Sequence, residues 1–346
     1  MDIQNRLKRS AVTIAVSKAL DSMKSDTKRS SRNLLDLGLL FSKDPQQRLF
    51  FEKARQVLNE PKNTYYQLIR SMIDNVNPET IKTVGINLGF NSLTYGTKQL
   101  QKMQASLGHY LPWMLAFLDL NQSQDFFNRI STYITQAQEL GIFCYLFIIN
   151  NYDSLYKFIT IAQQQLDCAF LLNTTGRLVN TESATLLSKL NNVVISLALD
   201  EKLFFENSIE QALRLLHGKK CLYGVHLNYN QENYSKVLNT SFLQQALALG
   251  CTFVTYNIGY LAEQAGKSQL YSFVKSVRES KEPQPIIVMD WQHDTEEISK
   301  YVGEGSDFLV LSSNGQVRCG RSDKHYLLQG SLTITDIIKM AMPCYP

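Results

Sequence analysis

Apolar residues in the first part of the chain recur every three or four positions, which is the spacing of amphipathic α-helices. A proline follows Asn77, and Pro at the first helical position suits a helix start. The predicted helices cover residues 11–23, 32–41, 47–58, 78–89 and 92–105. We therefore predict a helical N-terminal region over residues 1–108.

After Leu111 the pattern changes to short apolar runs that alternate with helical segments. The predicted strands are Trp113–Leu118, Ile142–Ile149, Ala169–Leu172, Val193–Ala198, Tyr223–Leu227, Thr252–Tyr256 and Ile286–Met289. The helices between them are Asp125–Leu140, Tyr152–Gln165, Thr181–Leu190, Ile209–Leu216, Ser241–Leu249 and Ser268–Ser280. Continuous apolar strands are typical of a parallel sheet that is covered on both faces. The alternation predicts an α/β barrel or a doubly wound sheet over residues 109–300.

The end of the chain has a different pattern. Phe308–Ser312 and Gln316–Cys319 flank an Asn314-Gly315 pair, which is a strong hairpin signal, and Thr333–Met340 has helical spacing. We predict a C-terminal extension over residues 301–346, built from a β-hairpin and a short helix.

Composition and charge exclude some classes of function. The 346 residues carry a net charge of +4, which is too small to argue for nucleic-acid binding. No apolar run reaches the roughly 18 to 20 residues of a transmembrane helix, and no signal peptide is recognisable, so we expect a cytoplasmic protein. The first 32 residues hold eight basic and three acidic side chains beside an apolar stripe. We expect this stripe to pack on the rest of the protein; the alternative is contact with an anionic membrane or a partner.

The cysteines and histidines give no metal-binding pattern. No two of the six cysteines lie within four residues of each other, and the first is Cys144. We expect them to be buried small hydrophobic residues. The five histidines are dispersed. His293 follows a predicted strand, and we expect a solvated loop residue, with a ligand or acid–base role as the alternative.

Several short motifs follow one another in a recognisable order. They are Pro112-Trp113 before the first strand, Asn173-Thr174-Thr175-Gly176 after the third, Ile195-Ser196-Leu197 in the fourth, Asn314-Gly315-Gln316-Val317-Arg318-Cys319, and Gly330-Ser331-Leu332-Thr333. In this order the chain, over roughly residues 30–340, resembles radical-SAM proteins that have a helical N-terminal annex and a SPASM-like C-terminal extension. The resemblance implies a partial (β/α)6-type TIM-like barrel between the helical region and the hairpin.

Two departures from that family concern its chemistry. The resemblance places a CxxxCxxC loop after the first strand, where three thiolates hold an iron–sulfur cluster. This chain has only Leu120-Asn121-Gln122-Ser123-Gln124 there, and no cysteine. The family's Gly-Gly-Glu-Pro segment, which contacts S-adenosylmethionine, is replaced by Ile149-Asn150-Asn151-Tyr152. We therefore expect a degenerate member with no iron–sulfur cluster, no other cofactor or metal, and no radical-SAM activity.

In a barrel, the residues at the C-terminal ends of the strands surround the functional mouth. This rule nominates a polar, amide-rich set of pocket candidates, which suits hydrogen bonding to a small polar ligand. The candidates are Asp119, Asn150, Asn173, Ser196, Asp200, His226, Asn228 and Asn257. The alternative is that they are ordinary residues at loop starts that satisfy backbone groups. No catalytic residue is assigned.

Three functions remain open from the sequence. The first is a pseudoenzyme that serves as a binding partner or scaffold for an active enzyme or a peptide substrate. The second is an enzyme of another class that uses the vacated barrel mouth, and the third is a small-molecule sensor. Because a fold does not dictate a function, the site must decide between them.

Overall fold

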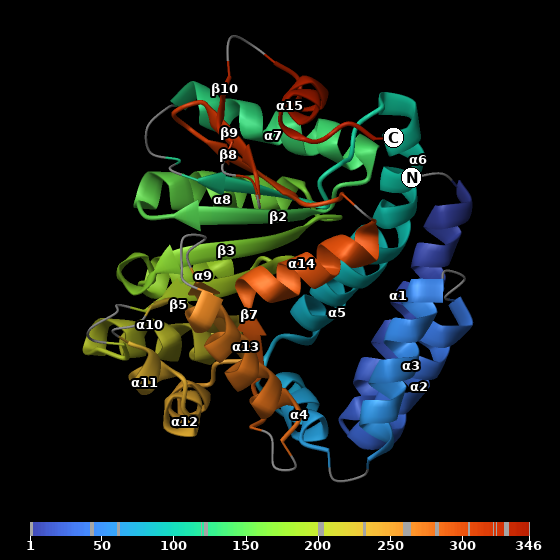
Figure 1. Cartoon of the computed structure of the whole chain (residues 1–346). Helices are drawn as coiled ribbons and strands as arrows, with labels where there is room; N and C mark the ends of the chain where they lie inside the picture. Colours follow the sequence, from blue (N-terminus) through green and yellow to red (C-terminus); the bar gives the residue numbers. More distant parts are fainter. Residues whose placement is uncertain are drawn as a thin grey trace.

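The computed structural model describes residues 3–41, 45–60, 63–118, 120, 124–199, 204–230, 233–258, 264–280, 284–303, 305–320, 322, 324–328 and 332–345. Its centre is a ten-stranded sheet in the order β10-β9-β8-β1-β2-β3-β4-β5-β6-β7 (Figure 1). The strands are β1 (Met114–Leu118), β2 (Cys144–Ile149), β3 (Ala169–Thr175), β4 (Val193–Ala198), β5 (Tyr223–Tyr229), β6 (Phe253–Ile258), β7 (Ile287–Asp290), β8 (Phe308–Ser312), β9 (Gln316–Cys319) and β10 (Tyr326–Leu327).

The strands from β1 to β8 are parallel, and β7 and β8 do not pair with each other in the part of the chain that the structure describes. The partial TIM-like barrel is therefore confirmed. β8 joins the seven predicted strands, so the sheet has more parallel strands than the (β/α)6 type implies. β8 was predicted only as one arm of a hairpin. It does pair with β9 in antiparallel fashion, but its other edge pairs in parallel with β1, so this strand belongs to the main sheet.

Helices connect the parallel strands. They are α7 (Gln124–Leu140), α8 (Tyr152–Gln164), η2 (Gly176–Leu178), α9 (Thr181–Leu187), α10 (Asn207–Gly218), α11 (Tyr234–Val237), α12 (Thr240–Ala248), α13 (Gln264–Arg278) and α14 (Trp291–Val302). The core forms between these helices and the outer sheet face. The ring centroid of Phe147 on β2 lies 5.0 Å from that of Phe117 on the neighbouring strand β1. It also lies 5.0 Å from the ring centroid of Phe158 of α8. This aromatic packing buries the outer face of the strands beneath the helices.

α14 connects β7 to β8 and packs against β6 and β7. The Trp113 indole donates a hydrogen bond to the Ser299 hydroxyl (3.0 Å), and the Trp291 ring lies 6.4 Å from the ring of Phe308. α14 therefore contacts the residue before β1 and the first residue of β8, two strands that pair with each other. After β10, α15 (Ile334–Ala341) packs on α7, since Gln136 accepts a hydrogen bond from the backbone N–H of Ile334 (2.9 Å).

The N-terminal region is helical, as predicted. Its elements are α1 (Ile3–Met23), α2 (Thr27–Phe41), α3 (Pro45–Asn59), α4 (Tyr65–Asn75), α5 (Pro78–Ile86), η1 (Asn87–Gly96) and α6 (Thr97–Leu107). α1, α2 and α3 form a layer along one side of the molecule, away from the strands (Figure 1). Val76 and Val84 pack with Leu222 in a small separate cluster, so α5 covers the start of the central strands. No described helix is long and apolar enough to cross a membrane.

η1 is a π-helix, where one ordinary helix starting near Ser92 was expected. Three hydroxyl groups donate to the carbonyl five residues earlier: Ser92 to Asn87 (2.9 Å), Thr94 to Gly89 (2.8 Å) and Thr97 to Ser92 (3.4 Å). This side-chain bonding follows the i to i+5 spacing of the widened turn.

Buried asparagines fasten this region to the barrel. The Asn87 amide donates to the carbonyl oxygens of Leu166 and Cys168 (2.8 Å each), and the Asn91 amide donates to the carbonyl oxygen of Asp167 (2.8 Å). Arg9 of α1 adds an ion pair to Asp167 (2.6 Å). η1 and α1 are therefore both held on the loop that precedes β3.

The apolar stripe of α1 was expected to pack on the rest of the protein. This holds only near the end of the helix, where Leu20 and Met23 are buried. Ile3, Leu7 and Ile14 are 79%, 67% and 70% exposed, so the expectation is wrong for the first three turns. The partly buried Val12 and Val16 lie on the side of the helix that faces the protein, and the exposed stripe lies on the opposite side.

The division into residues 1–108, 109–300 and 301–346 stays a prediction. The pairing of β8 with β1 links the last of these segments to the second.

Candidate functional site

The C-terminal ends of β3, β4, β5 and β6 bring five of the predicted pocket residues onto one face of the sheet. Strand pairing places Asn173 beside Ser196 and Asn228 beside Asn257, and His226 lies two residues before Asn228 on β5. These side chains alternate with the buried outer-face positions, so they point toward the inside of the partial barrel. We call Asn173, Ser196, His226, Asn228 and Asn257 the mouth cluster.

Two contacts organise the mouth cluster. The Ser196 hydroxyl lies 2.9 Å from Nδ1 of His226, and the Asn257 amide donates to the Asn228 side-chain oxygen at 3.2 Å. Ser196 is buried, His226 is partly buried, and Asn228 and Asn257 are exposed. The cluster therefore grades from an inner Ser–His pair to an outer pair of amides that solvent can reach.

The histidine of this cluster is uncharged at neutral pH. Burial lowers the pKa of His226 from 6.5 to about 4, because a buried imidazolium would lose its hydration. Either Ser196 donates to a bare Nδ1 or an Nδ1–H donates to Ser196, depending on the tautomer. All five side chains of the cluster are neutral, and each of them can both donate and accept hydrogen bonds.

The Ser–His pair lacks the rest of a hydrolytic site. A serine nucleophile needs a histidine that a third group orients, together with donors for the oxyanion. Within the described ranges no carboxylate hydrogen-bonds to His226, and its contact with Ser196 uses Nδ1. The arrangement is better suited to holding a polar, uncharged ligand than to activating Ser196.

Of the other three predicted pocket residues, the structure describes only Asn150. Asn150 is exposed after β2, and its side-chain oxygen accepts from Asn151 (3.3 Å), which itself caps α8 through the backbone N–H of Ser154. Asn150 therefore fits the role of a residue at a loop start. Asp119 and Asp200 lie outside the described residues.

The cysteines do not offer a cluster site. Cys144, Cys168, Cys221 and Cys251 are buried at or before the starts of four different strands, and Cys319 is buried on β9. Burial raises the pKa of the Cys144, Cys221 and Cys251 thiols to about 12, which opposes the thiolate form that iron–sulfur clusters require. No group of three His, Cys, Asp or Glu side chains in the described ranges could hold a metal ion. The residues that the structure describes therefore do not fit the cluster that the family resemblance implies.

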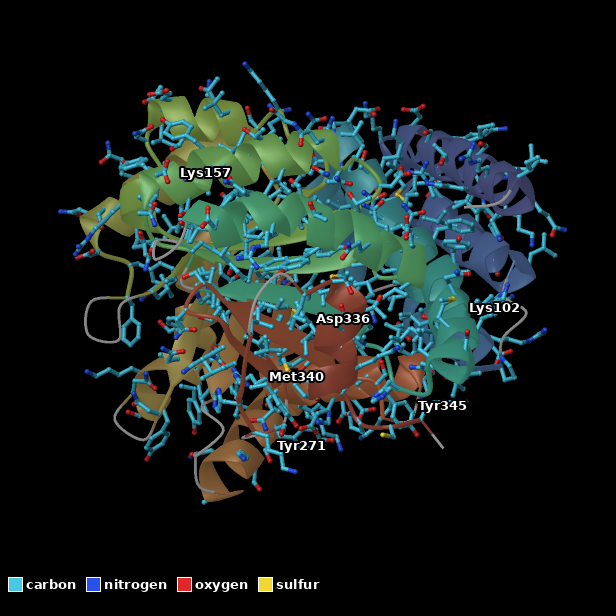
Figure 2. The ribbon with its side chains drawn as sticks, turned by 90° about the horizontal axis from the view of Figure 1, so that it is seen from above. Lys102, Lys157, Tyr271, Asp336, Met340 and Tyr345 are labelled. Atoms are coloured by element: carbon cyan, nitrogen blue, oxygen red, sulfur yellow. The ribbon has the colours of Figure 1, made fainter. Side chains whose placement is uncertain are left out.

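Two features of this edge of the sheet were missed from the sequence. Thr255 pairs with His226 across β5 and β6 and is buried on the same face, which the alternation of Phe253, Thr255 and Asn257 signals. Next to β7, a hollow of about 440 Å³ lies between α13 and α14. His293 was expected to be a solvated loop residue; it lies in α14 instead, with its ring 4.7 Å from Tyr271 at the molecular edge (Figure 2).

The chain matches no protein-family model, and no curated protein is similar to it in sequence. Solved structures include distant likenesses. SuiB from Streptococcus suis shares 11% identity with a TM-score of 0.49, over 80% of this chain and 76% of SuiB. SuiB bound to the precursor peptide SuiA shares 12% identity with a TM-score of 0.48, over 64% of this chain and 62% of SuiB. The protein anSMEcpe with bound AdoMet shares 10% identity with a TM-score of 0.43, over 64% of this chain and 78% of anSMEcpe.

In its peptide-bound structure, SuiB is matched over somewhat less than two thirds of its own length. Similarities this distant do not identify what this chain binds.

Proposed function

We propose that this chain is a catalytically inactive, radical-SAM-like protein that binds a peptide or a peptide segment of a partner protein at the mouth cluster. The observation that carries the proposal is the neutral, paired arrangement of Ser196–His226 and Asn228–Asn257 at adjacent strand ends. A peptide backbone presents N–H and C=O groups in turn. Side-chain amides match both kinds of group, because they donate and accept at once.

The inactivity part of the proposal rests on the cysteines. The sequence has none before Cys144, so the loop after β1 cannot supply the three thiolates. Burial holds the thiols of Cys144, Cys221 and Cys251 in the protonated form, and no group of three His, Cys, Asp or Glu side chains in the described ranges could hold a metal ion. Reductive cleavage of S-adenosylmethionine needs an electron from such a cluster, and these residues give it no ligands.

Anaerobic reconstitution of the full chain with iron and sulfide tests the proposed inactivity. We expect no stoichiometric iron, no charge-transfer absorbance, and no heat of S-adenosylmethionine binding by calorimetry. Stoichiometric cluster iron would overturn the inactive assignment.

Selection from a display library of unstructured peptides against the full chain tests the proposed peptide binding. Binding of the enriched peptides should fall about tenfold or more in Asn228→Ala/Asn257→Ala, which removes the outer amides. Asn59→Ala is the matched control, since Asn59 is also an exposed asparagine but ends α3. If the affinity for the peptides falls equally in both variants, or falls in neither, peptide binding at the mouth cluster is contradicted.

A second candidate is a small-molecule sensor, or an enzyme of another class, that binds its ligand at the same neutral Ser196–His226 pair. Screening the full chain against small ester and amide substrates separates an enzyme from a protein that only binds. Any turnover that disappears in Ser196→Ala but not in Asn257→Ala would assign an enzyme.

A further inference from the structure

The outer face of α1 carries an apolar stripe that no other described element covers. Ile3, Leu7, Ala11 and Ile14 follow one another at steps of four, four and three residues, so they lie on one side of the helix. All four are exposed, and the three large ones are exposed by two thirds or more. The stripe extends about 16 Å along the helix, from a rise of about 1.5 Å per residue.

Cations border this stripe. Arg6 and Lys8 are exposed on either side of it, and Lys18 is exposed at its end. The only acidic residue within the helix is Asp21, near its C-terminal end. Aliphatic side chains between Lys and Arg can bind an anionic bilayer in two ways, by burying apolar area and by attracting the lipid phosphates.

The opposite face of α1 is fixed to the protein. Leu20 and Met23 are buried, and Arg9 binds both Asp167 (2.6 Å) and the side chain of Asn91 (3.1 Å). The stripe therefore points away from the protein while the helix itself is held, at the edge of the molecule (Figure 2). A surface that binds the stripe would carry the whole chain with it.

We propose that this face of α1 binds an anionic lipid bilayer, with the aliphatic side chains in the headgroup region and the flanking cations on the lipid phosphates. A protein partner fits the observations less well. Protein interfaces are centred on aromatic side chains that enter pockets, whereas the stripe is purely aliphatic and stands on a convex helix. Its border of cations is complementary to a negatively charged surface. This inference is independent of the mouth cluster.

Co-sedimentation of the full chain with vesicles tests the proposal. We expect binding to phosphatidylcholine vesicles that contain phosphatidylglycerol, and weak binding to phosphatidylcholine alone. Arg6→Gln/Lys8→Gln should lower the affinity about fivefold for each cation that is lost. Leu7→Gln should lower it about tenfold or more, because the side chain no longer enters the apolar layer.

Leu327→Gln is the matched control, since Leu327 on β10 is 65% exposed and Leu7 is 67% exposed. It should leave vesicle binding unchanged, and circular dichroism should show both variants folded. Equal binding to the two kinds of vesicle, or equal loss in both Leu→Gln variants, would overturn the proposal. A dimer that dissociates in Leu7→Gln, without any vesicle binding by the original chain, would also overturn it and assign the stripe to contact between two copies.

Discussion

Two pairs of asparagines in this molecule have the same chemistry and opposite surroundings. Asn87 and Asn91 are 0% exposed behind the barrel, where their amides hydrogen-bond to each other and to backbone carbonyls. Asn228 and Asn257 are exposed at the mouth and hydrogen-bond mainly to each other. The first pair is committed to the protein's own backbone, whereas the second can exchange its contact for a ligand. The difference indicates which asparagines hold the fold and which are available for binding.

The largest expected effect is at the buried pair. Asn87→Ala removes the donors to the Leu166 and Cys168 carbonyls, and the buried Cys168 carbonyl loses this hydrogen bond. We expect a loss of about 3 kcal/mol in the free energy of unfolding. Asn228→Ala, the matched change at the mouth, should cost less than about 0.5 kcal/mol. Urea denaturation of both variants measures the difference, and similar losses would remove the distinction between the two pairs.

The next effect is the pH dependence of stability that His226 causes at the inner side of the mouth cluster. The folded-state pKa of His226 is about 4, compared with the ordinary histidine value of 6.5, so the unfolded chain binds a proton that the folded chain excludes. Above pH 6.5 the imidazole is neutral in both states and contributes no pH dependence. As the pH falls from 6.5 to about 4, stability should fall by up to about 3 kcal/mol through this group.

His226→Gln isolates this contribution from the carboxylates that titrate in the same range. Urea denaturation at pH 7.5 and pH 4.5 should show a smaller acid loss in the variant than in the original chain. An identical acid loss in both proteins would mean that His226 is not held neutral by burial.

The smallest effect is expected at the ion pair that supports the buried asparagines. The side chains of Arg9 and Asp167 are 30% and 53% exposed, so solvent screens their attraction. Arg9→Gln should cost about 1 kcal/mol or less, and the cost should shrink in high salt. Thermal melting at low and high salt measures it. A loss of stability that does not depend on salt and is as large as that of Asn87→Ala would mean that the Arg9 ion pair behaves as a buried contact.

Local patterns in the sequence were sufficient for most strands and helices. The predicted strand Val193–Ala198 is identical to β4, and the predicted helix Tyr152–Gln165 differs from α8 by one residue. These elements combine a buried apolar run with clear caps, such as Asn151 before α8. α14 was not predicted, because its apolar residues are sparse among the polar side chains of Trp291–Val302.

Long-range features could be predicted less well. The rule for strand ends placed Ser196 and His226 at the mouth, but their contact depends on the register between β4 and β5, which no local pattern sets. The parallel pairing of β8 with β1 joins segments almost two hundred residues apart and leaves no signal in either. The exposure of the α1 stripe could not be predicted either, because periodicity shows which residues share a helix face but not whether another element covers that face.

The π-helix η1 sets the angular phase of the chain between α5 and α6. Each residue of an α-helix advances the direction of the side chains by about 100°. The wider π turn advances it by less per residue, so the ten residues of η1 rotate the chain less than ten α-helical residues would. If η1 closed into an ordinary α-helix with the same number of residues, α6 would rotate relative to α5. Leu100, now 1% exposed in the core, would then turn away from it, while Asn87 would keep its place. The π-helical form of η1 thus sets the direction in which α6 faces the core.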